Sequence, residues 1–166
     1  MKVTNENEIR IKDYRICLHY IEKYWSEITF KYPHDEFTHL GLPNKFISPN
    51  NNIYRNDQFY WDSYFIILGL VKCGRTEIAK GMVDNFIFMQ KRFKIIPMPN
   101  RFYNLGCSQA PFLTSMAREV FGVTKDMQWM KTVMKSAENE LENYWMNRRL
   151  TEIHIVHEGL SRYCDH

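Results

Sequence analysis

The stretch from Phe59 to Val71 constrains the fold more than any other part of the chain, because almost every residue in it is apolar or aromatic. A run of this kind predicts a helix, and a helix that is apolar all round is a buried helix. We expect it to begin near Asp57 or Asp62 and to end at Cys73, where Gly74 provides a stop. Such a helix needs neighbours, so the fold must contain several more helices.

Two segments that flank this run also have helical periodicity. Residues 8–30 place most of their apolar side chains on one face: Ile9, Tyr14, Cys17, Leu18, Ile21, Trp25 and Ile28. The segment from Arg75 to about Phe93 has a broad apolar face: Ala79, Met82, Val83, Phe86, Ile87 and Met89. Pro33 marks the exit from the first segment, and Pro97 and Pro99 force a loop after the second.

Two further helices are expected in the C-terminal half. One begins near Ser108 or Gln109, with Pro111 in its first turn, where a missing N–H costs nothing. The other is long, begins at a Thr124 cap and runs to about Arg148. Its inward face should consist of Met127, Met130, Val133, Met134, Ala137, Leu141, Tyr144 and Trp145.

The connections between these helices are uneven in length. No segment predicts a convincing strand and residues 151–166 have no clear period, so we expect one all-α domain over residues 1–166. Residues 34–56 form an irregular connection with a run of three asparagines from Asn50. A connection this long is usually functional or disordered, and its position before Trp61 favours a loop on the substrate side. The loops before the second and fourth helices should lie at the same end of the helical stack, because alternate helices point the same way.

Composition excludes several classes of protein. The chain has 166 residues, of which 45% are hydrophobic and 15% aromatic, which argues against disorder. A net charge of +3 is too small to indicate a nucleic-acid partner. The apolar run from Tyr64 to Val71 is far shorter than the roughly 20 residues of a membrane span. The N-terminus has no apolar leader segment, and the four cysteines form no CxxC pair, so we expect a cytoplasmic protein with free thiols and no metal.

Aromatic, amide and carboxylate side chains crowd the loops before the second and fourth helices. Aromatic faces cover the C–H side of a sugar ring, while carboxylates and amides match its hydroxyl groups, so this pattern predicts a carbohydrate site. The candidate substrate contacts are Trp61, Asp62, Asn100, Arg101, Ser108 and Gln109. The alternatives are that Trp61 fills the core, that Asp62 and Ser108 cap helices, and that Asn100 bonds the backbone of a turn.

The order of several short blocks resembles the trehalase family of glycoside hydrolases, from about residue 50 to the end. The blocks are Gln58-Phe59-Tyr60-Trp61-Asp62-Ser63-Tyr64-Phe65, Gly81-Met82-Val83-Asp84-Asn85-Phe86, Pro97 to Tyr103, Ser108-Gln109-Ala110-Pro111 and Gly159-Leu160-Ser161-Arg162-Tyr163-Cys164-Asp165. The resemblance implies an α/α toroid of six helical hairpins, of which this chain holds about the first five helices. It also implies inverting hydrolysis of α,α-trehalose to glucose, with no metal and no cofactor.

The resemblance also bears on single residues. It implies sugar contacts for Trp61, Asp62, Ser108 and Gln109, and the family's Asn-Arg pair matches a loop here. That match lies at Asn100 and Arg101.

Three positions depart from the family pattern. Tyr54 stands where the pattern has a sugar-binding Arg, Met98 replaces an Asn, and Cys107 replaces a second Arg. Each hydrogen-bond partner lost from a buried sugar site costs roughly 1–3 kcal/mol.

The family's acid and base lie beyond the block that ends at Asp165, so we assign no catalytic residue to this chain. We therefore expect a truncated segment, inactive alone, whose uncovered apolar faces lead to self-association or to binding of the missing C-terminal part. The alternatives are a non-catalytic remnant that retains sugar binding and an unrelated helical interaction module.

Overall fold

The structure is a computed structural model, and it describes residues 6–146, 156–157 and 160–161. In chain order the elements are α1 (Glu6–Glu27), β1 (Thr29–Phe30), β2 (Phe46–Ile47), α2 (Tyr60–Lys72), α3 (Thr76–Phe93), the 3-10 helix η1 (Phe102–Asn104), α4 (Leu113–Thr124), α5 (Met127–Glu140), the π-helix η2 (Leu141–Trp145), β3 (Val156–His157) and β4 (Leu160–Ser161). The predicted all-α class is confirmed, since strands contribute only two short pairs in the part of the chain described.

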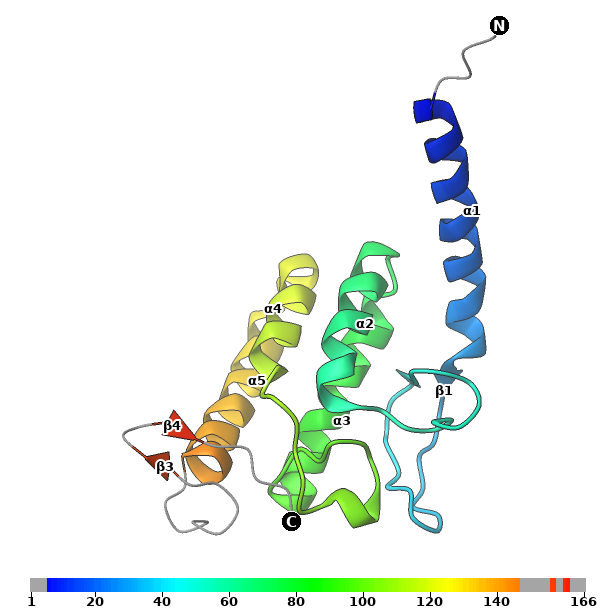
Figure 1. The fold of residues 1–166 in the computed structure, drawn as a ribbon. Coiled ribbons are helices and arrows are strands. Elements are labelled where there is room, and N and C mark those ends of the chain that lie inside the picture. Colours follow the sequence, from blue (N-terminus) through cyan, green and yellow to red (C-terminus); the bar gives the residue numbers. More distant parts are fainter. Residues whose placement is uncertain (1–5, 147–155, 158–159, 162–166) are drawn as a thin grey trace, which may run out of the picture.

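The helices pair into two layers. α2 and α4 lie side by side, and α3 packs against both, while α5 packs against α3 and α4 (Figure 1). The sequential pairs α2–α3 and α4–α5 are therefore two hairpins of an arc, as a partial α/α toroid requires. Fully buried side chains of α2, α3 and α4 fill the space between the layers: Ile67, Leu70, Met82, Val83, Phe86, Met116 and Val120.

One face of α2 remains open, which corrects the expectation of burial on all sides. Ile67 and Leu70 are fully buried, whereas Trp61 is 47% exposed and Phe65 is 62% exposed. Apolar residues around a helix indicate that every face is suited to burial, but none of the described elements covers this side of α2.

α1 is a helix as predicted, but it ends at Glu27 because Thr29 and Phe30 enter strand β1. β1 pairs antiparallel with β2, with Phe30 opposite Phe46, and β3 pairs with β4 within the tail 151–166, in which the sequence showed no clear period. The prediction of no strand was therefore wrong, because strands of two residues are too short to show alternation.

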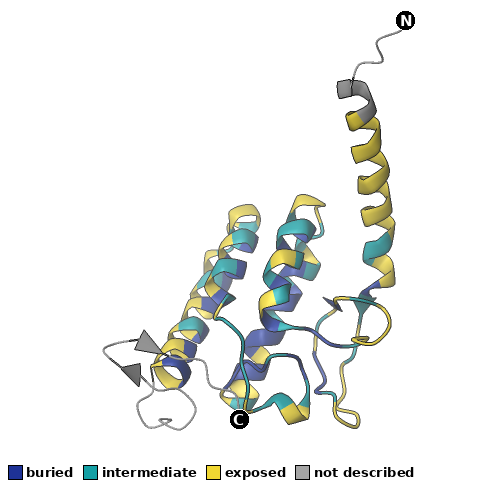
Figure 2. Cartoon of the chain, viewed as in Figure 1, coloured by how far each residue is buried: buried dark blue, intermediate teal, exposed yellow. Residues whose placement is uncertain are grey.

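The predicted buried face of α1 is also mostly wrong. α1 projects away from the other helices (Figures 1 and 2). Tyr14 is 68% exposed and Leu18 is 62% exposed, while Ile28, just beyond the helix, is buried. Only the C-terminal end of α1 meets the body, where the Trp25 ring lies over Gly69.

The C-terminal helices differ from expectation in two ways. α4 begins at Leu113 rather than near Ser108, so Pro111 lies before the helix. The cap of α5 is Asp126, whose side chain accepts a hydrogen bond from the Trp129 N–H at 2.9 Å, and not Thr124.

The inward face of α5 and η2 agrees only in part with the prediction, since Val133, Tyr144 and Trp145 are buried as expected. The buried residues of the helix are Trp129, Val133, Ser136 and Glu140. Met127, Met134 and Leu141 are 59%, 38% and 53% exposed. The pattern contained two adjacent apolar stripes, and only one of them faces α3 and α4.

The connection 34–56 is an ordered part of the body. Leu40 and Leu42 are buried, and their N–H groups donate to the backbone of Asn100 and Tyr32. A Cβ at Gly41 would lie 2.6 Å from the His34 backbone, so only glycine permits this close approach.

Candidate functional site

The N-terminus of α2 is held by the loop that precedes α4. The Tyr60 N–H donates to the Met98 carbonyl at 2.8 Å, and the Trp61 N–H donates to Gln109 Oε1 at 3.1 Å. These bonds satisfy helix N–H groups that would otherwise lack partners. The first turn of α2, with Trp61 and Asp62, is thereby fixed beside Gln109, so two predicted contacts from distant segments meet at one end of the helical layers (Figure 1).

Trp61 and Asp62 are accessible in this arrangement. The Trp61 ring does not fill the core, since the residue is 47% exposed. Asp62 does not cap α2 either: the cap position is Phe59, and no side chain caps the helix there. Asp62 is half-buried in the first turn, where the helix dipole favours a negative charge. Both alternatives from the sequence are excluded, while sugar binding by the pair stays a prediction.

Ser108 and Gln109 have different surroundings. The Ser108 hydroxyl donates to the Ile96 carbonyl at 2.7 Å, which ties the part of the connection just before α4 to the part just after α3. Ser108 does not cap α4, because that helix begins at Leu113. Gln109 uses its carbonyl oxygen on α2.

Asn100 is fully buried and joins three segments. Its Oδ1 accepts from the Gln58 N–H at 2.7 Å, and its Nδ2 donates to the carbonyls of Leu40 and Asn56 at 2.9 and 3.2 Å. The amide therefore bonds backbone, but that of distant segments and not, as the turn alternative proposed, that of its own turn. A sugar contact for Asn100 stays a prediction, and the structure assigns its side chain to the support of the site.

Arg101 forms a bidentate ion pair with Asp57. Nε and Nη2 lie 2.6 and 3.0 Å from the two carboxylate oxygens, and Nη1 donates to Thr38 Oγ1 at 3.0 Å. This carboxylate raises the pKa of the Arg101 guanidinium. His39 Nε2 lies 3.1 Å from the same carboxylate. Asp57 is buried, so its charge requires these partners.

The sequence analysis missed two sets of hydrogen-bonded residues that support the candidate site. The first is a chain of amides, in which Gln58 Nε2 donates to the Met82 carbonyl at 2.9 Å and Asn85 Nδ2 donates to Gln58 Oε1 at 2.9 Å. Asn85 Oδ1 also accepts from the Asn44 N–H at 3.0 Å. The only signal available was a polar residue, Asn85, within the apolar face of the third helix.

The second is a buried carboxyl behind α2. Both oxygens of Glu140 lie 2.9 Å from the Tyr60 hydroxyl, and Trp145 Nε1 lies 3.4 Å from Oε1. The Leu113 N–H, in the first turn of α4, donates to the Tyr60 hydroxyl at 3.1 Å. Burial raises the pKa of the Glu140 carboxyl to about 7, against the two hydrogen bonds, which lower it.

The three departures from the family pattern surround the same helix end. The Met98 carbonyl accepts from Tyr60, and the Met98 N–H donates to the Cys107 carbonyl at 2.9 Å. The Tyr54 ring packs edge-on against Phe59, with centroids 5.3 Å apart. The exchanges at Tyr54, Met98 and Cys107 therefore lie within the predicted sugar site.

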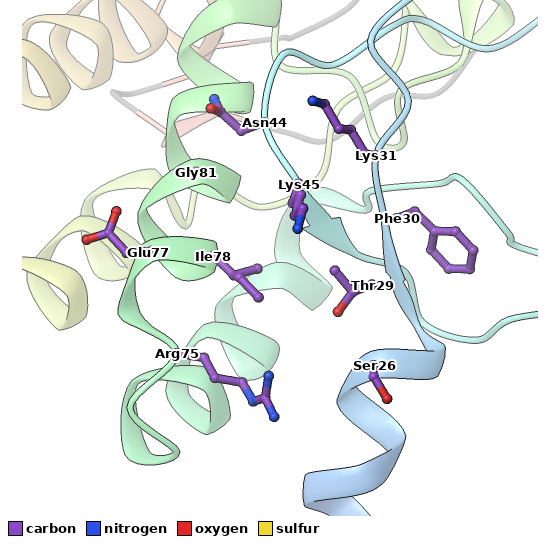
Figure 3. A pocket seen from close by; sticks show the side chains of 10 residues that line it. All are labelled: Ser26, Thr29, Phe30, Lys31, Asn44, Lys45, Arg75, Glu77, Ile78 and Gly81. Atoms are coloured by element: carbon purple, nitrogen blue, oxygen red, sulfur yellow. The ribbon is translucent and has the colours of Figure 1, made fainter.

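A separate pocket lies between the end of α1, the β1–β2 pair and the start of α3. It has a volume of about 660 Å³, and Lys31, Lys45 and Arg75 approach it from different elements (Figure 3). None of the predicted sugar contacts lines it. Arg75 is paired with Glu22 at 2.5 Å, and the pocket has no converging acid and base, so we place the functional site at the α2 and α4 ends.

Neither a metal nor a bilayer is indicated by the described residues. Within them, no three His, Cys, Asp or Glu side chains are grouped so that they could share an ion. None of the described helices combines the length and apolar character of a membrane span.

Comparison with known proteins gives consistent results. A family model described as Trehalase matches residues 7–166. The chain is 34% identical to a trehalase from Tenebrio molitor over 129 residues, which is 78% of this chain and 22% of that protein. It is 35% identical to a periplasmic trehalase from Xanthomonas axonopodis pv. citri (strain 306) over 69% of this chain and 19% of the relative.

Among solved structures, the neutral trehalase Nth1 from Saccharomyces cerevisiae matches with a TM-score of 0.59 and 32% identity. The match covers 63% of this chain and 20% of the yeast chain. The chain thus spans about a fifth of the length of these relatives.

Proposed function

Because the chain belongs to the trehalase family, we propose that it forms the N-terminal, sugar-facing arc of a trehalase-type α/α toroid and takes part in the hydrolysis of α,α-trehalose to glucose. The observation that carries this proposal is the meeting of the α2 and α4 ends, where Gln109 fixes the first turn of α2. Trp61 and Asp62 are left accessible at that point. Trp61 offers an aromatic face to the C–H side of a glucose ring, and Asp62 offers a carboxylate to its hydroxyls.

The chemical step requires groups that we do not assign to this chain. Inverting hydrolysis uses one carboxylic acid to protonate the leaving oxygen and one carboxylate to activate water, roughly 6.5–9.5 Å apart. Asp57, which lies just before α2 in the sequence, is buried and paired with Arg101, so it is not available as a base. We propose that the acid and the base come from other hairpins of the ring, outside the fifth of a trehalase that this chain spans.

Two apolar stripes, which the described residues leave partly exposed, support ring completion. On α1 the residues follow one another at intervals of three and four: Ile11, Tyr14, Leu18, Ile21 and Trp25. All but the last are exposed. On α5 and η2 the same spacing recurs through Met127, Met130, Met134, Ala137 and Leu141. α1 and α5, which carry the two stripes, lie on opposite sides of the helical body (Figure 1), where further hairpins of a ring would pack.

The side chains around the α5 stripe indicate what its cover should look like. A groove of about 450 Å³ includes Met127, Met130 and Met134, and Lys131 and Lys135 line its sides. An amphipathic helix with an apolar face and acidic flanks fits this groove. We propose that a later part of a trehalase-type ring supplies it.

The test is complementation. The purified chain is mixed with the part of the Tenebrio molitor trehalase that lies beyond the segment it matches, and glucose release from trehalose is measured. We expect no glucose from the chain alone and glucose from the mixture, with loss of activity on Asp62→Asn. Glucose release by the chain alone would contradict the assignment of acid and base to other hairpins.

Edge variants separate docking from catalysis. Leu18→Glu and Met134→Glu should prevent co-elution of the two parts on gel filtration, because each puts a charge into an apolar contact. Phe37→Glu is the matched control, since Phe37 is 96% exposed and belongs to neither stripe. Co-elution that survives both stripe variants would overturn the proposed docking edges.

A second candidate is sugar binding without hydrolysis, and the exchanges at Tyr54, Met98 and Cys107 favour it, because they remove two cationic donors and an amide from the α2 end. Titration calorimetry of the chain with trehalose and with glucose tests this candidate. Saturable binding that is lost in Trp61→Ala and Asp62→Asn would support it. Flat titrations at millimolar sugar would remove it.

A further inference from the structure

Behind the α2 end, the Tyr60 hydroxyl connects three elements that are far apart in the sequence. It belongs to the first residue of α2, it donates to Glu140 at the end of α5, and it accepts from the Leu113 N–H at the start of α4. Tyr60 is fully buried and Glu140 is 5% exposed. A buried hydrogen-bonded chain of this kind fixes the relative position of its members, because no water replaces a lost partner.

The local irregularity of the last helix contributes to this contact. In a regular α-helix two residues five apart are rotated by about 140° from each other. Glu140 and Trp145 are five apart, yet Trp145 Nε1 faces the Glu140 carboxyl at 3.4 Å. The π-helix η2 (Leu141–Trp145) between them provides the additional residue in the turn. The helix is therefore irregular at the turn in which the Trp145 indole bonds the Glu140 carboxyl.

We infer that Glu140 is a positioning residue for the proposed sugar site, acting through the Tyr60 hydroxyl on the N-terminal ends of α2 and α4. The inference rests on the proposed function for its consequence, but its geometric part is independent of any sugar. Glu140 lies behind the helix, and Trp61, which follows Tyr60 directly, lies at the accessible surface. A change in the Tyr60 bond moves the helix end that carries Trp61 and Asp62.

The ionisation of Glu140 changes the strength of this connection. An ionised carboxylate accepts the Tyr60 O–H in a charge-assisted bond, which is stronger than a bond to a neutral carboxyl. Burial opposes the charge and raises the pKa of Glu140 to about 7. The connection is therefore tightest above neutral pH, and it weakens as the carboxyl takes up a proton.

Among the described residues, the polar groups that face Glu140 are neutral at these pH values. They include the Tyr60 hydroxyl from α2, the Leu113 N–H from α4 by way of that hydroxyl, and the Trp145 indole from η2. From α3, the Phe86 ring packs against Tyr60 at 5.0 Å between centroids and adds no charge. Glu138 and Glu140 both line an apolar cavity of about 250 Å³. No cation among the described residues pairs with Glu140.

The experiment uses the four tryptophans of the chain, labelled with 5-fluorotryptophan and assigned by Trp→Phe variants. The fluorine spectrum is recorded from pH 5.5 to 8.5 without sugar. We expect the Trp145 signal to titrate because the indole touches the carboxyl, and the Trp61 signal to follow with the same midpoint. Glu140→Gln should remove both titrations.

Two further variants keep the result interpretable. Tyr60→Phe removes only the connecting hydroxyl, so Trp145 should still titrate while Trp61 should not. Asp84→Asn is the matched control: Asp84 is a half-buried carboxylate that is also bonded to an indole, Trp129 Nε1 at 2.7 Å, and it lies away from this junction. It should leave the Trp61 and Trp145 titrations intact.

A titration at Trp145 with a constant Trp61 signal in the unmodified chain would overturn the inference, as would a Trp61 titration that persists in Tyr60→Phe. Sugar binding is then measured at pH 6 and pH 8, where we expect about threefold tighter trehalose binding at pH 8 and no difference in Glu140→Gln. If trehalose does not bind at either pH while the fluorine titrations behave as expected, the proposed function fails and the positioning role stands.

Discussion

Apolar faces of two helices, α2 and α5, end in different environments. Ile67 of α2 is fully buried, whereas Met134 of α5 is 38% exposed, although each lies in an apolar stripe with helical spacing. Ile67 faces α3 and α4, and Met134 faces a groove that no described element covers. Periodicity thus shows that a face is adapted to contact, but it does not show whether the same polypeptide supplies the partner.

The junction of α2 and α4 differs from both of these apolar faces, because polar groups hold it together. Asn100, Gln58 and Glu140 are buried and bonded to partners far away in the sequence. Apolar stripes tolerate a missing neighbour at the cost of exposed surface, while a buried polar group tolerates it poorly. We therefore expect the site end to remain ordered even while the edges of the arc are uncovered.

The largest expected effect is a difference in stability between a variant in the buried face of α2 and a variant in the α5 stripe. Ile67→Ala leaves a cavity in the closed part of the core and should lower the free energy of unfolding by about 2–5 kcal/mol. Met134→Ala should change it by less than about 1 kcal/mol, because the side chain is partly in water. Urea unfolding of both variants measures the difference. Equal losses would mean that the α5 stripe is covered in solution by another copy of the chain.

The second comparison concerns Asn100. Asn100→Ala leaves the Gln58 N–H and the Leu40 carbonyl without this partner in a buried setting, so we expect a loss of about 3 kcal/mol in the free energy of unfolding. Asn104→Ala is the control, since Asn104 Oδ1 has no hydrogen-bond partner among the described residues. A loss in Asn104→Ala as large as that in Asn100→Ala would show that the amide network does not hold the junction.

The sequence predicted those parts of the fold that depend on local pattern. The second and third helices and the meeting of Trp61 with Gln109 follow from apolar runs, from Gly and Pro, and from the alternation of helix direction. The face of α5 that points inward did not follow, because Val133 and Met134 are both apolar and neighbours decide between them. The bond from Tyr60 to Glu140 spans 80 residues and has no local signature.

The candidate site was predictable to a similar extent. The sequence indicated which loops carry it, but not that Asn100 and Arg101 use their polar atoms within the chain. Their partners, Leu40 and Asp57, come from the irregular connection and its end. No periodic pattern relates such residues, so only the folded arrangement separates supporting from accessible polar side chains.

The third comparison uses pH. The pKa of Glu140 is raised from 4.5 to about 7 in the folded protein. The stabilisation from this neutral carboxyl is present below pH 4.5 and is lost as pH rises through 7, so the free energy of unfolding should fall by about 2–3 kcal/mol from pH 4.5 to 8. Glu140→Gln should lack this decline, and Glu138→Gln, at an exposed position, should retain it. A wild-type stability that rises between pH 6 and 8 would contradict the assignment.

The smallest effect on stability is expected for substitutions of the accessible residues Trp61 and Asp62. Trp61→Ala and Asp62→Asn should each change the free energy of unfolding by less than about 1 kcal/mol, because neither side chain is buried in the core. The same substitutions should abolish saturable trehalose binding, since stacking and hydroxyl recognition depend on these groups. Calorimetric titration and urea unfolding on the same preparations separate the two readouts. If either variant unfolds far more easily and sugar binding is unchanged, then the α2 end is a structural junction throughout, and the sugar site lies on a different face of the arc.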